Sequence, residues 1–151
     1  MLNKIHDYNE KVNIKSRRLE RPCFRGKGFE EDGEADMSGI LREVNIKSDM
    51  PTVDDAIRRI TYNIKNAPAL GVTAIKFIHG YGASGKGGAI REEARKYLDR
   101  QIARSQIKFY IKGEDFSIFD ESTRKAFAIC DGLRHDSDLE RHNNGVTIVI
   151  L

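Results

Sequence analysis

Apolar residues along this chain follow two spacings, one typical of strands and one typical of helices. The run from Val72 to Ile78 is rich in β-branched and aromatic residues, which predicts a mostly buried strand. Apolar and polar residues alternate from Ile107 to Ile111, as in a half-buried strand. Two further strands are predicted, a short one at Val44 to Ile46 and a final one at Val146 to Leu151.

Helical spacing marks the segments between these strands. Thr52, with Asp55 three residues later, predicts the start of a first helix that ends before Pro68. Its apolar stripe consists of Val53, Ala56, Ile57, Ile60 and Ile64. A second amphipathic helix is predicted from Gly88 to about Arg100, and a short extra helix from Ser122 to Cys130.

The resulting order is β-α-β-α-β-(α)-β. It favours a two-layer α/β sandwich, with a small mixed sheet of about four strands and two main helices. Residues 131–145 are polar, with four acids and two histidines in no recognised ligand spacing. They are interpreted as a solvated loop rather than a metal site.

The N-terminal forty residues differ in composition from the rest. Seven basic residues and one acid lie between Lys11 and Gly28, and five acids follow between Glu30 and Asp36. Such blocks usually stay solvated, so residues 1–40 are expected to form a charged flexible tail before a domain at 41–151. A second interpretation is a basic arm that adds contacts to phosphate.

Overall composition excludes little. A formal net charge of +3 in 151 residues is a weak argument for nucleic acid by itself. No apolar run approaches the ~18 residues of a membrane span, and the N-terminus has no hydrophobic signal region. Cys23 and Cys130 sit in no metal-ligand spacing, which favours free thiols in a reducing compartment. A cytoplasmic protein without membrane partners is expected.

Candidate chemistry gathers between the strand at Val72–Ile78 and the second helix. His79 is followed by five glycines within Gly80–Gly88, and then by a basic helix. A turn of this kind presents backbone N–H groups and a helix N-terminus, which together favour bound phosphate. A purely structural turn is the simplest alternative, but it needs fewer glycines.

A nucleotide-binding P-loop is another interpretation. Residues 80–86 satisfy G-x-x-x-x-G-K after a strand and before a helix. However, Gly87 stands where that motif needs a Ser or Thr hydroxyl for magnesium. The expected sheet is also small for such a fold, so this interpretation ranks below the next.

A nucleic-acid site accounts for more of these residues. Glycines let the backbone approach a sugar-phosphate chain, basic side chains supply charge, and His79 is the candidate catalytic acid or base. The candidate nucleic-acid-binding residues are Lys47, Gly80, Tyr81, Gly82, Gly85, Lys86, Gly87, Gly88, Arg91 and Arg95. The expected partner is DNA or RNA, and no metal-binding residue is assigned.

The block Ile78-His79-Gly80-Tyr81-Gly82, with Gly88-Ala89-Ile90-Arg91 after it, resembles the Smr (small MutS-related) domain family, which carries an HGxG signature and a G-x-[LI]-R helix start. The opening at Thr52–Ala56 and the ending at Asn144–Leu151 fit the same family, so the resemblance covers residues 44–151. It implies a compact α/β fold, nucleic-acid binding and, in several members, endonuclease activity.

Two departures from the family pattern bear on activity. The family's first strand reads L-D-L-[HR]-G, whereas this chain has Asn45 and Lys47 at the acid and the His/Arg positions. An amide cannot act as a general base, although a lysine can still bind phosphate. The segment from Gly113 to His142 also looks like an insertion. Weak endonuclease activity and a non-catalytic binding module therefore both stay open, as does a divalent metal cofactor.

Overall fold

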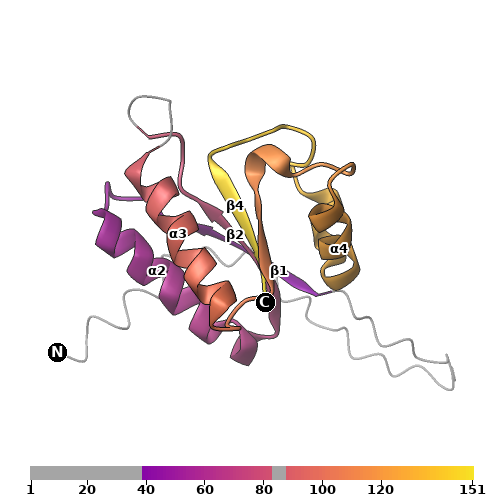
Figure 1. Ribbon diagram of the computed structural model, residues 1–151, viewed down its shortest axis with the longest axis horizontal. Coiled ribbons are helices and arrows are strands. Elements are labelled where there is room, and N and C mark those ends of the chain that lie inside the picture. The colour runs from indigo at the N-terminus through magenta and orange to yellow at the C-terminus, as the bar shows by residue number, and fades with distance from the viewer. Residues whose placement is uncertain (1–38, 83–87) are drawn as a thin grey trace, which may run out of the picture. The chain divides into compact units, whose positions relative to one another are not determined.

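The computed structural model describes residues 39–82 and 88–151 (Figure 1). The predicted flexible tail therefore lies almost wholly outside the described residues, as do Gly85, Lys86 and Gly87 of the candidate site. The division between tail and domain remains a prediction from composition.

Four strands and three α-helices alternate along the described chain. They are β1 (Ile40–Asn45), α2 (Val53–Asn66), β2 (Val72–Ile78), α3 (Ala89–Ala103), β3 (Phe109–Lys112), α4 (Glu121–Ile129) and β4 (Val146–Ile150). Short 3-10 helices are η2 (Pro68–Leu70), η3 (Gly113–Asp115) and η4 (Asp131–His135). This order is the predicted one, with the extra helix α4 inside the expected insertion.

The strands form one mixed sheet in the order β1-β2-β4-β3. Strands β1 and β2 are parallel, whereas β4 runs antiparallel to both β2 and β3. The predicted α/β fold with a small mixed sheet is thus confirmed. Because β1 and β2 are parallel, their carboxyl ends meet at the same edge of the sheet, and antiparallel β4 begins there.

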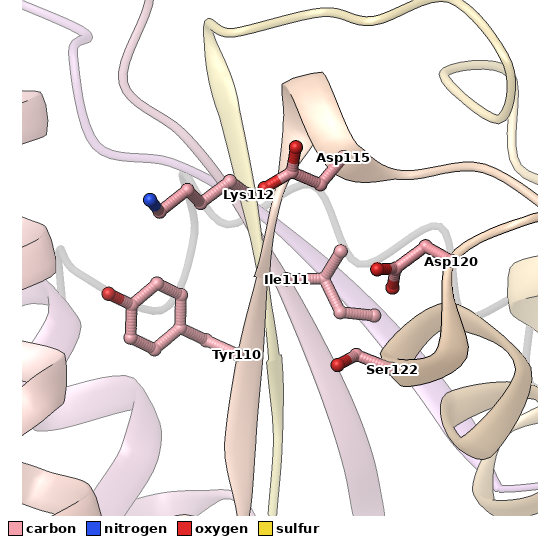
Figure 2. A pocket seen from close by; sticks show the side chains of 6 residues that line it. All are labelled: Tyr110, Ile111, Lys112, Asp115, Asp120 and Ser122. Atoms are coloured by element: carbon pink, nitrogen blue, oxygen red, sulfur yellow. The ribbon is translucent and has the colours of Figure 1, made fainter.

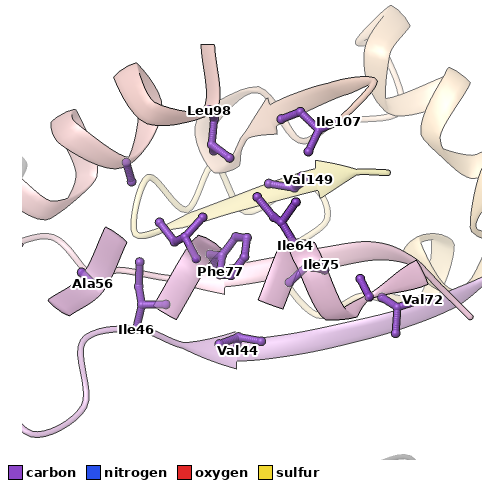
Figure 3. Packing of buried hydrophobic residues seen from close by; sticks show 13 residues of the cluster. Val44, Ile46, Ala56, Ile64, Val72, Ile75, Phe77, Leu98, Ile107 and Val149 are labelled. Atoms are coloured by element: carbon purple, nitrogen blue, oxygen red, sulfur yellow. The ribbon is translucent and has the colours of Figure 1, made fainter. Parts of the chain in front are cut away.

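One face of the sheet packs against α2 and α3. Its core includes Ile64 from α2, Leu98 from α3 and Phe77 from β2, all nearly inaccessible to water (Figure 3). Helix α2 presents its apolar stripe to the sheet, and its start is fixed by the predicted capping box between Thr52 and Asp55. These contacts hold the ends of β1 and β2 in place beside the start of α3.

The opposite face is covered by the segment between β3 and β4, with α4 lying on that side of the sheet (Figure 1). Phe116, Phe127 and Leu133 pack there against Ile148 and Ile150 of β4. The insertion is therefore a second hydrophobic layer, and the interpretation of residues 131–145 as a solvated loop was wrong for part of its length. Leu133 is buried in η4. Two acids between η4 and β4, Asp136 and Asp138, form ion pairs with the buried Lys76.

Among the described residues, no helix is long and apolar enough to cross a membrane.

Candidate site at the glycine turn

The candidate site begins where β1 and β2 end together. Asn45 is the register partner of Ile78, and the backbone N–H of Ile46 donates to the carbonyl of Ile78 at 3.0 Å. This pairing brings Lys47 over the residue that follows His79. A Cβ placed on Gly80 would lie 3.0 Å from Cδ of Lys47 and 3.4 Å from its Nζ. The sheet thus joins two residues that the sequence places more than thirty positions apart.

His79 is 4% exposed, and both of its ring nitrogens have partners. Nδ1 lies 3.0 Å from the carbonyl oxygen of Gly80, and Nε2 lies 2.9 Å from Oγ1 of Thr147. Since a carbonyl only accepts, Nδ1–H is the donor, and in the neutral ring Nε2 accepts from the Thr147 hydroxyl. In this geometry the candidate acid or base holds the turn in shape rather than facing solvent.

The backbone of the turn is tightly packed against the start of β4. The N–H groups of His79 and Gly80 both donate to the carbonyl of Gly145, at 3.0 and 2.9 Å. A Cβ on Gly145 would lie 3.3 Å from Cα of Gly80, so a side chain would crowd this contact. Gly80 and Gly82 both adopt positive φ, at 71° and 75°, a conformation that favours glycine. The turn therefore needs its glycines for shape as well as for access.

Tyr81 stands at the exposed tip of the described turn. Its hydroxyl donates to Oδ1 of Asn143 at 2.6 Å, and the same oxygen accepts from the N–H of Gly145 at 2.9 Å. The amide of Asn143 donates in turn to Oδ1 of Asp138 at 2.8 Å. Asn143 thus connects the tip of the turn to the loop before β4.

The ammonium group of Lys76 anchors that loop. Lys76 is 2% exposed and lies within 3.0 Å of Asp136, with Asp138 in direct contact and Glu43 at 3.5 Å. Burial alone would lower the pKa of Lys76. The carboxylates of Asp136 and Asp138 together outweigh burial and raise that pKa above its ordinary value. The hydrogen bonds from Asn143 and Lys76 hold the pKa of Asp138 low despite burial. A buried lysine requires carboxylate partners. The position of Lys76 inside the apolar run Val72–Ile78 is therefore a signal in the sequence that acids pack against this strand.

Two arginines lie in the first half of α3. Arg95 makes a double hydrogen bond to the Glu114 carboxylate, at 2.9 and 2.7 Å. This ion pair links η3 to α3. Arg91 lies one turn nearer the start of α3, partly buried, and acts with Arg95 on the pKa of His79. Helix α3 begins after Gly88 with no side-chain hydrogen bond at its N-cap.

Several positioning residues were not predicted from sequence. Arg59 of α2 donates to the carbonyls of Ile46 and Ser48, at 3.3 and 2.9 Å, and so holds the loop that carries Lys47. The side chain of Asn45 accepts from the N–H of Lys47 at 3.0 Å. The side-chain amide of Asn45 thus closes a local turn around Lys47.

A hollow of about 210 Å³ lies elsewhere, along the exposed edge of β3 (Figure 2). It is lined by Tyr110, Ile111 and Lys112 of β3, by Asp115, and by Asp120 and Ser122 at the start of α4; Ile111 points toward Asp120 and Ser122, whereas Tyr110 and Lys112 point to the other side of β3. Asp120 already caps α4 through the N–H of Thr123 at 2.7 Å. The hollow shares no residue with the glycine turn. Within residues 39–82 and 88–151, no three His, Cys, Asp or Glu side chains are grouped to hold a metal ion.

These features define a small α/β domain with a glycine turn at the carboxyl ends of two parallel strands. No family model matches the chain, and no curated protein does. The chain is similar to the crystal structure of the Smr domain of Thermus thermophilus MutS2, with 21% sequence identity and a TM-score of 0.45. That match covers 72% of this chain and 95% of the other.

Proposed function

We propose that this chain binds nucleic acid, DNA or RNA, through the glycine turn and the residues around it. The observation that supports this best is the position of Lys47 over Gly80, at the shared ends of β1 and β2. The ammonium group of Lys47 thus lies beside the backbone of Gly80, which has no side chain to keep a phosphate away. Arg91 and the N-terminus of α3 add positive potential at the same end of the domain.

The proposed contacts are mostly to the phosphate backbone. From the described residues they comprise Lys47, Gly80, Tyr81, Gly82, Gly88 and Arg91. Gly85, Lys86 and Gly87 are included from the sequence alone. Arg95 is also included, with its guanidinium held by Glu114. Binding of this kind is largely independent of sequence and weakens steeply with salt.

Strand cleavage is not part of the proposal. His79, the candidate acid or base, is buried with both nitrogens bonded, and Asn45 offers an amide in place of a carboxylate. Nucleotide binding by a P-loop gains no support either: the sheet is small and mixed, with β2 parallel to β1 and antiparallel to β4, and Gly87 stands where the motif needs a hydroxyl. A binding module is what this geometry supports.

The test is a salt series of binding titrations with end-labelled duplex DNA and structured RNA. Lys47→Ala and Arg91→Ala should weaken binding to all sequences alike and reduce the salt slope by about 1 each. Lys65→Ala, an exposed lysine at the far end of α2, is the matched control and should change neither. Unchanged affinity in both site variants would overturn the placement of the site.

The same samples on denaturing gels address cleavage. Intact strands beside a mobility shift support a binding module. Cleavage by the wild-type chain, abolished in His79→Ala, would instead make the chain a nuclease and assign the chemistry to the turn. A shift in thermal unfolding with ATP and magnesium, without nucleic-acid binding, would favour the nucleotide interpretation.

A further inference from the structure

We infer that Tyr81 is a stacking platform for an unpaired base, so the ligand of the glycine turn is single-stranded or locally unpaired nucleic acid. This inference rests on the proposed function and narrows it. Tyr81 is 50% exposed although its hydroxyl is hydrogen-bonded to Asn143. With the hydroxyl engaged, the aromatic ring is the part of the side chain left to contact a ligand.

The ring is held by a chain of contacts that reaches the protein interior. Asn143 accepts from the Tyr81 hydroxyl at 2.6 Å, and Asp138 accepts from the Asn143 amide at 2.8 Å. Asp138 is in turn paired with Lys76, which is buried on β2. An exposed tyrosine without such anchoring loses side-chain conformational entropy when it binds a ligand. The hydrogen bond to Asn143 already restricts the Tyr81 side chain, so binding costs less conformational entropy here.

Stacking and phosphate contact are adjacent along the chain. Tyr81 lies between Gly80 and Gly82, and Lys47 lies over Gly80. A nucleotide with its phosphate at Lys47 and Gly80 therefore has an aromatic ring on the very next residue. One residue cannot read sequence this way, because every base has a face that can stack.

Stacking on Tyr81 distinguishes unpaired strands from duplexes. In a duplex each base is covered on both faces by its neighbours, and only its edges are open in the grooves. An unpaired base can leave the stack and lie on an aromatic side chain. Tyr81 should therefore add affinity for single strands, loops or strand ends, and little for an intact duplex.

The test measures binding of the full chain to single strands and duplexes of equal length, each as DNA and as RNA, at one salt concentration. Tyr81→Leu removes the ring, and Tyr81→Phe keeps it without the hydroxyl. Tyr62→Leu is the matched control, since Tyr62 is 46% exposed on α2, away from the turn. Tyr81→Leu should weaken single-strand binding about 5- to 100-fold and change duplex binding less than about twofold.

Tyr81→Phe should retain most single-strand affinity, and Tyr62→Leu should retain all of it. Single-strand affinity unchanged in Tyr81→Leu, while Lys47→Ala weakens binding, would overturn stacking and leave the proposed function standing. An equal loss on single strands and duplexes in Tyr81→Leu would also overturn it. No binding of any strand by the wild-type chain would overturn both proposals. Urea unfolding of each variant shows whether the fold is kept.

Discussion

The ammonium nitrogen of Lys76 lies 3.0 Å from Oδ1 of Asp136, inside the layer formed by the segment between β3 and β4. Lys76 is on β2, three residues before His79, and its second partner, the partly buried Asp138, also accepts a hydrogen bond from Asn143. One cation thus pairs with two acids of the inserted segment and fixes the loop that contacts the glycine turn. The relationship ties the stability of the second layer to the geometry of the candidate site.

Lys76→Met should lower the free energy of unfolding by about 3–5 kcal/mol, because it leaves buried carboxylates without their counter-charge. Urea denaturation at neutral pH measures this loss. Lys96→Met is the matched control: its pair with Glu93 is exposed on both sides, so its loss should change stability far less than the loss of Lys76. Equal losses in the two variants would contradict the structural role of Lys76.

The fold was largely predictable because β2 and α2 have clear hydrophobic patterns. The run at Val72–Ile78 predicted both ends of β2, and Thr52 with Asp55 predicted the start of α2. Strand β1 was predicted only at Val44–Ile46, because its first residues are exposed or half-buried and show no alternation. The second layer was missed because residues 131–145 are polar by composition. The sequence shows that Lys76 interrupts an apolar run, but it does not show which acids approach it from sixty residues away.

The site was predictable only where residues are close in sequence. Gly80, Tyr81 and Gly82 were singled out from the motif, and the sheet brings Lys47 close to Gly80. Asn143 could not be identified, because its contact with Tyr81 depends on how the loop before β4 folds. The burial of His79 was equally hidden, since it depends on Thr147 lying across from the end of β2.

Gly80→Ala should weaken nucleic-acid binding as well as stability. Gly80 has a φ of 71°, so an added Cβ costs roughly 1–2 kcal/mol and also pushes against the Lys47 side chain. Gly71→Ala imposes the same backbone strain at a φ of 68°, at the other end of β2, where the nearest atom is 3.7 Å away. Thermal unfolding and binding titrations should show similar destabilisation in both variants and weaker binding in Gly80→Ala alone. Binding lost equally in both would mean that strain, not Lys47, is responsible.

Thr147→Val should destabilise the domain by about 1–3 kcal/mol. The change keeps the shape of the side chain but leaves Nε2 of His79 without its donor in a buried site. Thr61→Val is the control, because its hydroxyl, which bonds the Ile57 carbonyl and the Tyr97 hydroxyl, lies partly exposed, where water can replace it. Urea denaturation should show the larger loss for Thr147→Val. A smaller loss there than in Thr61→Val would contradict the proposed bond to His79.

Acidification should reveal His79 as a buried neutral imidazole. Burial lowers the pKa of His79 below its ordinary value of 6.5, and the charges of Arg95 and Arg91 act in the same direction. As pH falls below about 6.5, the unfolded chain takes up a proton at this residue that the folded chain does not, so stability falls with pH in that window. Nitrogen NMR of the ring should show the Nδ1–H tautomer of His79 persisting at a pH below 6.5, where an unperturbed imidazole is already charged. A ring that titrates at or above pH 6.5 would mean that His79 is accessible to water, and would restore it as a candidate acid or base.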